Sequence, residues 1–174
     1  MAALLAYYTA PGDWRDAAIR WWTGASTSHV ELILAPPGTE GDSVRPDPAT
    51  GWRAISASAS ERDGGVRRKE IAFTPDTWTL QTVPWAVAPP SDAPVSCEGA
   101  RYDWRGLALS QVFGAGRHTA DRWFCSEWCA HQLGMINPQQ FSPGELHDAI
   151  EAGAALYRAG IDAGRNERMR HGLA

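Results

Sequence analysis

The sequence predicts a single α+β domain in which an antiparallel sheet packs against helices. The N-terminal half holds short apolar or alternating runs separated by turn residues, which is typical of antiparallel strands. The C-terminal half instead shows helical spacing, with capping residues at the expected helix starts. The chain of 174 residues is long enough to bury one core, and no linker or internal repeat divides it.

The strands are predicted from aliphatic and β-branched runs that end at turns. Two such runs flank a turn over 61–65 and predict a hairpin, whereas 36–50 is rich in Pro, Gly and Asp and predicts a long loop. Strand alternation places His29, Glu31 and Ile33 on one face. The predicted strands are 4–8, 29–34, 52–60, 66–73 and 78–87.

The helices are predicted from their caps and apolar spacing. Asp13 marks one helix start, and Ser142 with Glu145 forms a capping box at another. The predicted helices are 13–23, 103–113, 125–133 and 143–158. We expect the domain to span 1–160, followed by a charged tail over 161–174 whose low hydrophobicity is compatible with disorder.

Charge and composition exclude several classes of function. The net charge of −4 argues against a nucleic-acid partner, which needs a positive field. No apolar run approaches the roughly 20 residues that a bilayer crossing requires, so we expect no integral membrane segment. The N-terminus lacks the basic region of a secretory signal, and a cytoplasmic location is the expectation, with a phage or prophage origin left open.

Cys125 is the strongest candidate for a catalytic nucleophile. It falls in the first turn of a predicted helix, where unpaired N–H groups and the helix dipole favour a thiolate and can bind an oxyanion. A buried structural cysteine is the alternative for Cys125, and core packing is the expectation for Cys129, one turn later. A metal site built from Cys125, Cys129 and His131 is not expected, because these positions on one helix cannot converge tetrahedrally.

A nucleophilic cysteine needs a base, and five histidines are available. His131 lies six positions after Cys125 on the same helix and points to roughly the opposite side. His29 opens a strand after a loop of small residues, where a rigid element can aim its ring. A structural role is the alternative for His29.

The order of several short motifs resembles a known family. The chain carries, in order, Trp22-Thr23-Gly24, Ser28-His29-Val30-Glu31-Leu32, Asp63-Gly64-Gly65-Val66-Arg67, Tyr102-Asp103 and Phe124-Cys125-Ser126-Glu127. Over about 4–135 this resembles the circularly permuted branch of the NlpC-type, papain-like cysteine hydrolases, related to the lecithin retinol acyltransferase group. In that branch the histidine strand precedes the cysteine helix.

The resemblance implies both a fold and an activity. The fold is papain-like with permuted order, an antiparallel sheet or partial barrel that carries His29 and packs against the Cys125 helix. Cys125 is the implied nucleophile and His29 the base of a cysteine peptidase or amidase-type hydrolase, or of an acyltransferase, working through an acyl-enzyme without cofactor or metal. The implied substrates are peptides, including cell-wall crosslinks, or lipid and other acyl groups, and oligomeric state is left open.

The third residue, which orients the imidazole, is open between three candidates. The family usually places a polar residue on the strand after the histidine, and the best register puts Ser58 there. Glu61 takes this place if the register slips. Glu31 shares the face of His29 but lies one pleat, roughly 6–7 Å, along the strand.

Three further residues are expected to bind substrate. Tyr102, Trp123 and Ser126 flank the helix starts nearest the expected site, with core packing as the alternative. A serine as third residue and nine tryptophans also leave open a different function, a non-catalytic binding module that retains the groove. Loss of turnover with retained ligand binding after Cys125→Ser distinguishes an enzyme from such a module.

Overall fold

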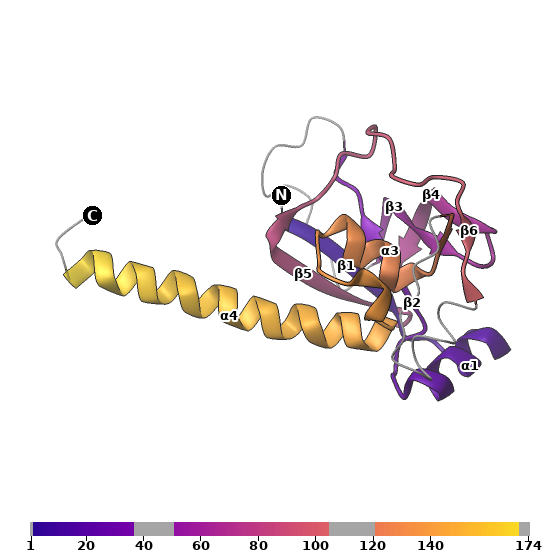
Figure 1. Ribbon diagram of the computed structural model, residues 1–174, viewed down its shortest axis with the longest axis horizontal. Coiled ribbons are helices and arrows are strands. Elements are labelled where there is room, and N and C mark those ends of the chain that lie inside the picture. Colours follow the sequence, from indigo (N-terminus) through magenta and orange to yellow (C-terminus); the bar gives the residue numbers. More distant parts are fainter. Residues whose placement is uncertain (1, 37–50, 105–120, 171–174) are drawn as a thin grey trace.

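The computed structural model describes residues 2–36, 51–104 and 121–170, with side chains described up to residue 162. Its fold is mixed α+β, with a curled seven-stranded sheet in the order β5-β1-β2-β3-β4-β6-β7 (Figure 1). Neighbouring strands are antiparallel except β6 and β7, which are parallel. The strands are β1 (Ala2–Tyr8), β2 (His29–Ile33), β3 (Trp52–Ser60), β4 (Gly65–Phe73), β5 (Trp78–Val87), β6 (Arg101–Tyr102) and β7 (Arg122–Trp123).

The helices of the described residues are α1 (Trp14–Thr23), α3 (Cys125–Gln132) and α4 (Pro143–Arg170), with a 3₁₀ turn, η1 (Pro138–Gln140), between the last two. Helix α3 packs across β2 and β3, and α4 packs beside β5 before it projects beyond the sheet (Figure 1). No helix in this part of the chain is both long and apolar enough to span a membrane.

The five predicted strands and the helices at 13–23 and 125–133 are confirmed within a few residues. Strands β6 and β7 were not predicted, because two residues are too short for any periodicity. Helix α4 does not end at 158 but continues to Arg170, so that 161–170 of the predicted charged tail is helical. No proline interrupts this stretch. The predicted helix over 103–113 and the loop over 36–50 lie almost entirely outside the described residues.

The main core lies between the sheet and helix α3. Val30 and Leu32 of β2 point into it, whereas His29, Glu31 and Ile33 occupy the other positions of the strand, as alternation predicted. The largest fully buried members of the core are Trp128, Tyr7, Leu5, Leu32, Leu146 and Ile150.

Strands β2 and β3 separate near the start of β2. They pair at Leu32 with Ala57 and at Ile33 with Ser56. Nearer to His29, the Val30 carbonyl accepts a hydrogen bond of 2.6 Å from the Ser58 hydroxyl. A side chain thus replaces the backbone donor that a paired strand would supply. The carbonyl of Val30 is therefore satisfied although the strands have parted.

Helix α1 is tied to the start of β2 through one buried carboxylate. Asp16 closes a capping box with Asp13, accepting from its backbone N–H at 3.0 Å. Asp16 also accepts from the Ser28 hydroxyl at 2.7 Å and from Arg62 at 2.6 Å. Because Ser28 directly precedes His29, these contacts fix the backbone from which His29 projects.

We expect Asp16→Ala to lower the free energy of unfolding by about 2–3 kcal/mol, because a cap is lost and the buried Ser28 hydroxyl loses its acceptor. Urea denaturation measures this change. Arg62→Ala is the matched control and should cost less than about 1 kcal/mol, because Arg62 is half exposed. Equal losses in the two variants would contradict the role assigned to Asp16.

Candidate active site

Cys125 is the first residue of helix α3 and has no solvent exposure. Phe124 before it is extended, so the chain turns sharply into the helix and the backbone N–H of Cys125 lies at the helix start. The thiol forms hydrogen bonds with two side chains, His29 and Tyr102. Residues far apart in the sequence thus meet at the front of α3.

The parallel pair of short strands brings Tyr102 to the cysteine. Tyr102 of β6 is registered with Trp123 of β7, two residues before Cys125. A backbone hydrogen bond of 2.9 Å from Asp103 to the Trp123 carbonyl closes this pairing. The phenol of Tyr102 therefore approaches the thiol from a fixed backbone.

His29 is held between Cys125 and Glu31. Its Nε2 lies 2.8 Å from Oε1 of Glu31, and its side chain is 20% exposed. Since Nε2 is engaged by the carboxylate, Nδ1 is the ring nitrogen available to the thiol. The imidazole is thus oriented by a carboxylate on one side and a thiol on the other, the geometry expected of a nucleophile, its base and an orienting group.

Glu31 is a fully buried carboxylate with several partners. Two nitrogens of Arg67 donate to its two oxygens at 2.8 and 2.6 Å, and the Ser56 hydroxyl donates at 3.1 Å. Arg67 is itself held by Asp63 at 2.8 Å. A bidentate pair of this kind compensates for the cost of burying the carboxylate.

The partners of His29 and Glu31 shift the pKa of each residue toward its charged form. Burial favours neutral His29, but the negative charge and hydrogen bond of Cys125, together with Glu31, raise the pKa of His29 to about 10. Burial likewise opposes ionised Glu31, but its hydrogen bonds to Arg67 and His29 lower the pKa of Glu31 to about 2. At neutral pH His29 is therefore an imidazolium and Glu31 a carboxylate.

Tyr102 differs from His29 because it stays neutral. Burial, followed by the charge and hydrogen bond of Cys125, raises the pKa of Tyr102 well above its ordinary value. The phenol therefore keeps its proton and remains a hydrogen-bond donor at the sulfur.

Of the three candidates for the orienting residue, the structure brings Glu31 to His29. Ser58, the preferred candidate, donates instead to the Val30 carbonyl, and Glu61 pairs with Arg15 at 3.3 Å. The backbone of Glu31 lies one pleat, roughly 6–7 Å, from that of His29, yet their side chains meet at 2.8 Å. Two long side chains on the same face close this gap, so backbone spacing is a poor guide to the distance between their ends.

The three residues expected to bind substrate have different environments. Tyr102 borders the cavity beside His29. Trp123 is 3% exposed and packs its ring 4.9 Å from that of His131, so it belongs to the core. Ser126 is also buried and donates to the Phe141 carbonyl at 2.6 Å, which ties α3 to the segment before α4. Trp123 and Ser126 therefore serve packing.

A cavity of about 360 Å³ opens beside His29, a volume typical of small-ligand sites. His29 and Tyr102 both border it and both contact the thiol, so Cys125 lies one side chain away from the cavity. Its remaining aromatic lining comes from Tyr8, Trp78 and Trp104, and its charged lining includes Arg62, Asp63, Arg67, Lys69 and Glu70.

Sequence reasoning missed Arg67 and Ser56 as members of the site. Arg67 lies in the quoted turn motif, but its contact with Glu31 depends on the pairing of β3 with β4. The available signal was the predicted hairpin of 52–60 with 66–73, whose register places Arg67 opposite Ser58. That signal becomes specific only once the partner strands are known.

Cys129, expected in the core, is indeed fully buried, and its thiol donates weakly to the Val30 carbonyl at 3.8 Å. Burial, followed by the charge of Cys125, raises the pKa of Cys129 well above its ordinary value. Cys129 is therefore a protonated, poorly nucleophilic thiol.

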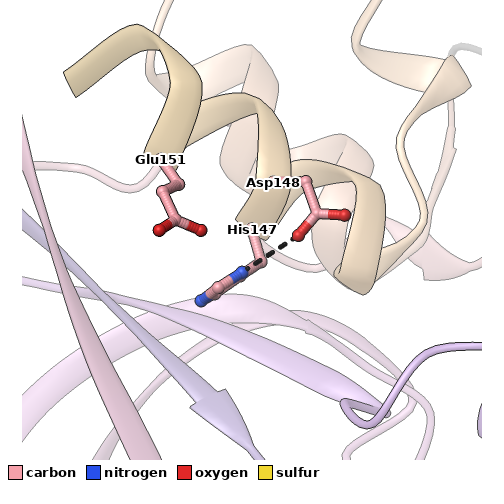
Figure 2. Close-up of side chains that lie close together, drawn as sticks. All are labelled: His147, Asp148 and Glu151. Atoms are coloured by element: carbon pink, nitrogen blue, oxygen red, sulfur yellow. Dashed lines mark hydrogen bonds and ion pairs between the residues drawn. The ribbon is translucent and has the colours of Figure 1, made fainter. Parts of the chain in front are cut away.

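A separate cluster of metal-ligating side chains lies on helix α4. His147, Asp148 and Glu151 place their ligand atoms within 4.8 Å of one another, and Nδ1 of His147 lies 3.3 Å from Asp148 (Figure 2). Both carboxylates are exposed, and the ring of His147 packs edge-on against Tyr7. Exposed acidic groups gather in this way without an ion, so the cluster alone does not define a metal site.

Comparisons with protein-family models, curated proteins and solved structures returned no match. The site is therefore interpreted from its own geometry.

The two shifted groups predict how stability depends on pH. Glu31 stabilises the fold above its ordinary pKa of 4.5, and this contribution is lost as the pH falls toward its folded pKa of about 2. His29 stabilises the fold below its ordinary pKa of 6.5, and this contribution is lost as the pH rises through its folded pKa of about 10. Urea denaturation from pH 2 to 10 measures both limbs.

Glu31→Gln and His29→Ala serve as the matched pair for that experiment. We expect Glu31→Gln to flatten the acid limb relative to the wild type and His29→Ala to flatten the alkaline limb. Unchanged pH profiles in both variants would show that the charges of Glu31 and His29 do not contribute to stability.

Proposed function

We propose that the protein is a cysteine-dependent hydrolase or acyltransferase that acts on an amide or ester. The observation that carries the proposal is the contact chain from Cys125 through His29 to the buried Glu31. The order of the chain also supports a circularly permuted papain-like fold, because the histidine strand β2 precedes the cysteine helix α3, which packs on a curled sheet.

The first step is acylation of Cys125. Its thiolate attacks the acyl carbon of the substrate, and the carbonyl electrons move onto oxygen to form a tetrahedral oxyanion. The oxyanion collapses, the bond to the leaving amine or alcohol breaks, and imidazolium His29 gives that group its proton. The product of this step is a thioester on Cys125 and a neutral His29.

Two donors are placed to stabilise the oxyanion. The backbone N–H of Cys125 lies at the positive end of helix α3, and the protonated phenol of Tyr102 approaches the same sulfur. A preorganised donor of this kind contributes about 100-fold or more to the rate of acyl transfer. Tyr102 is thus the second donor in this proposal.

The second step regenerates the thiolate. Neutral His29 takes a proton from water or an acceptor alcohol, which attacks the thioester, and the sulfur leaves as the thiolate beside the re-formed imidazolium. Glu31 is a positioning residue: its hydrogen bond keeps the Nδ1 of His29 aimed at the sulfur, and Arg67 keeps Glu31 ionised.

The alternative of a non-catalytic binding module rested on a serine as the orienting residue and on the many tryptophans. The contact between Glu31 and His29 supplies a carboxylate in that role, which favours the enzyme. Peptides and lipid or other acyl groups both remain within this proposal as substrates.

Acylation with p-nitrophenyl acetate tests the proposal, because this ester needs no specific recognition. We expect a burst of p-nitrophenolate at pH 7 and an acetyl group on Cys125 in peptide mass spectrometry. Cys125→Ser and His29→Ala should each reduce the burst rate by at least about 100-fold. Cys97→Ser is the matched control, because Cys97 is an exposed thiol, and it should leave the burst unchanged.

Acetylation of Cys97 alone, or a burst that survives Cys125→Ser, would contradict the proposal. Ligand binding with no acylation in the wild type would favour the binding module.

A further inference from the structure

Helix α1 has the reverse of the polarity expected for a surface helix. Its buried residues are Asp16 and Ile19, and every charged side chain of the helix is bonded within the protein. Arg15 pairs with Asp13 and Glu61, and Arg20 donates to the carbonyls of Ala10 and Pro11. A surface helix ordinarily directs charge outward and apolar residues inward.

The outward face of α1 is aromatic, and the charged group beside it is paired: the Arg15 guanidinium lies 5.1 Å from the centre of the Trp14 ring and forms ion pairs with Asp13 and Glu61. Trp14 is 71% exposed, Trp21 86% and Trp22 47%, and their spacing of seven and eight positions places them on one side of the helix. We call these three residues the tryptophan face. Figure 1 shows α1 at the edge of the molecule, away from the sheet.

We propose that the tryptophan face docks the protein on a zwitterionic lipid surface. Tryptophan rings prefer the boundary between lipid headgroups and acyl chains, where the ring is apolar and its N–H stays wet. The Arg15 guanidinium at its edge is already paired with the carboxylates of Asp13 and Glu61, so the face matches a bilayer of no net charge better than an anionic one. Binding here needs no catalysis and is independent of the proposed hydrolysis.

The size of the tryptophan face argues against a second protein as its partner. The exposed parts of three rings offer roughly 300–500 Å² of apolar surface. A stable protein interface covers about 800 Å² on each side. A bilayer requires no complementary surface and accepts a small, convex group of aromatic side chains.

Docking would also bring the cavity to the lipid. Arg15, Asp16 and Ile19 of α1 form part of its wall, so the helix that carries the tryptophan face borders the site beside His29. An acyl substrate in the lipid surface is then close to the cavity, whereas a peptide substrate gains nothing from this arrangement.

Vesicle binding of the full-length protein tests the proposal. We expect the wild type to co-sediment with phosphatidylcholine vesicles at millimolar lipid, with a blue shift of its tryptophan fluorescence. Trp14→Ser with Trp21→Ser should lower the partition coefficient at least about tenfold, because binding scales with the buried apolar area. Both rings are largely exposed, so the fold should survive, and circular dichroism checks this.

Ile136→Ser with Leu156→Ser is the matched control. Ile136 is 85% exposed and Leu156 76%, and neither lies on α1, so vesicle binding should not change.

Three results would each overturn the proposal: no binding by the wild type, equal loss in both double variants, or binding that requires anionic lipid and disappears in high salt. Self-association that the tryptophan variant abolishes, without vesicle binding, would instead assign the face to a second copy. Binding by Cys125→Ser equal to wild type would separate docking from catalysis.

Discussion

The buried ion pair between Glu31 and Arg67 is the interaction on which the site depends. A carboxylate with no solvent exposure is costly unless it is paired and hydrogen-bonded, and Glu31 meets both conditions through Arg67 and Ser56. These three residues lie on β2, β4 and β3, so the pair also joins the centre of the sheet. Loss of either charge would leave the other buried alone.

The orientation of the His29 ring depends on the ion pair between Glu31 and Arg67. Arg67 keeps Glu31 ionised, Glu31 holds Nε2 of the imidazole, and the ring then presents Nδ1 to Cys125. Burial lowers the pKa of His29, but the charge and hydrogen bond of Cys125, together with Glu31, outweigh that effect and raise it to about 10. The same site raises the pKa values of Tyr102 and Cys129 well above their ordinary values, so both keep their protons.

Local signals predicted the elements well but the contacts only partly. The helix start at Asp13 and the alternation of β2 depend on neighbours in the sequence, and both were predicted. The role of Arg67 depends on strand pairing over more than thirty positions, which no local pattern records. Ser58 was misassigned because the parting of β2 from β3, which directs its hydroxyl to a backbone carbonyl, is a tertiary feature. Apolar spacing predicted the helix over 13–23, yet spacing alone does not show which of its faces is buried, and Trp14, Trp21 and Trp22 are exposed.

The protonation state of His29 tests the central claim most directly. Nitrogen NMR of the imidazole in the wild type should show both ring nitrogens protonated at pH 8, in accordance with a pKa of about 10. In Cys125→Ser the pKa of His29 should fall, because the thiolate is the largest of the contributions that raise it. A neutral imidazole at pH 8 in the wild type, with the same titration in Cys125→Ser, would show that Cys125 does not raise the pKa of His29. That result would contradict the assignment of Cys125 and His29 as a reactive pair.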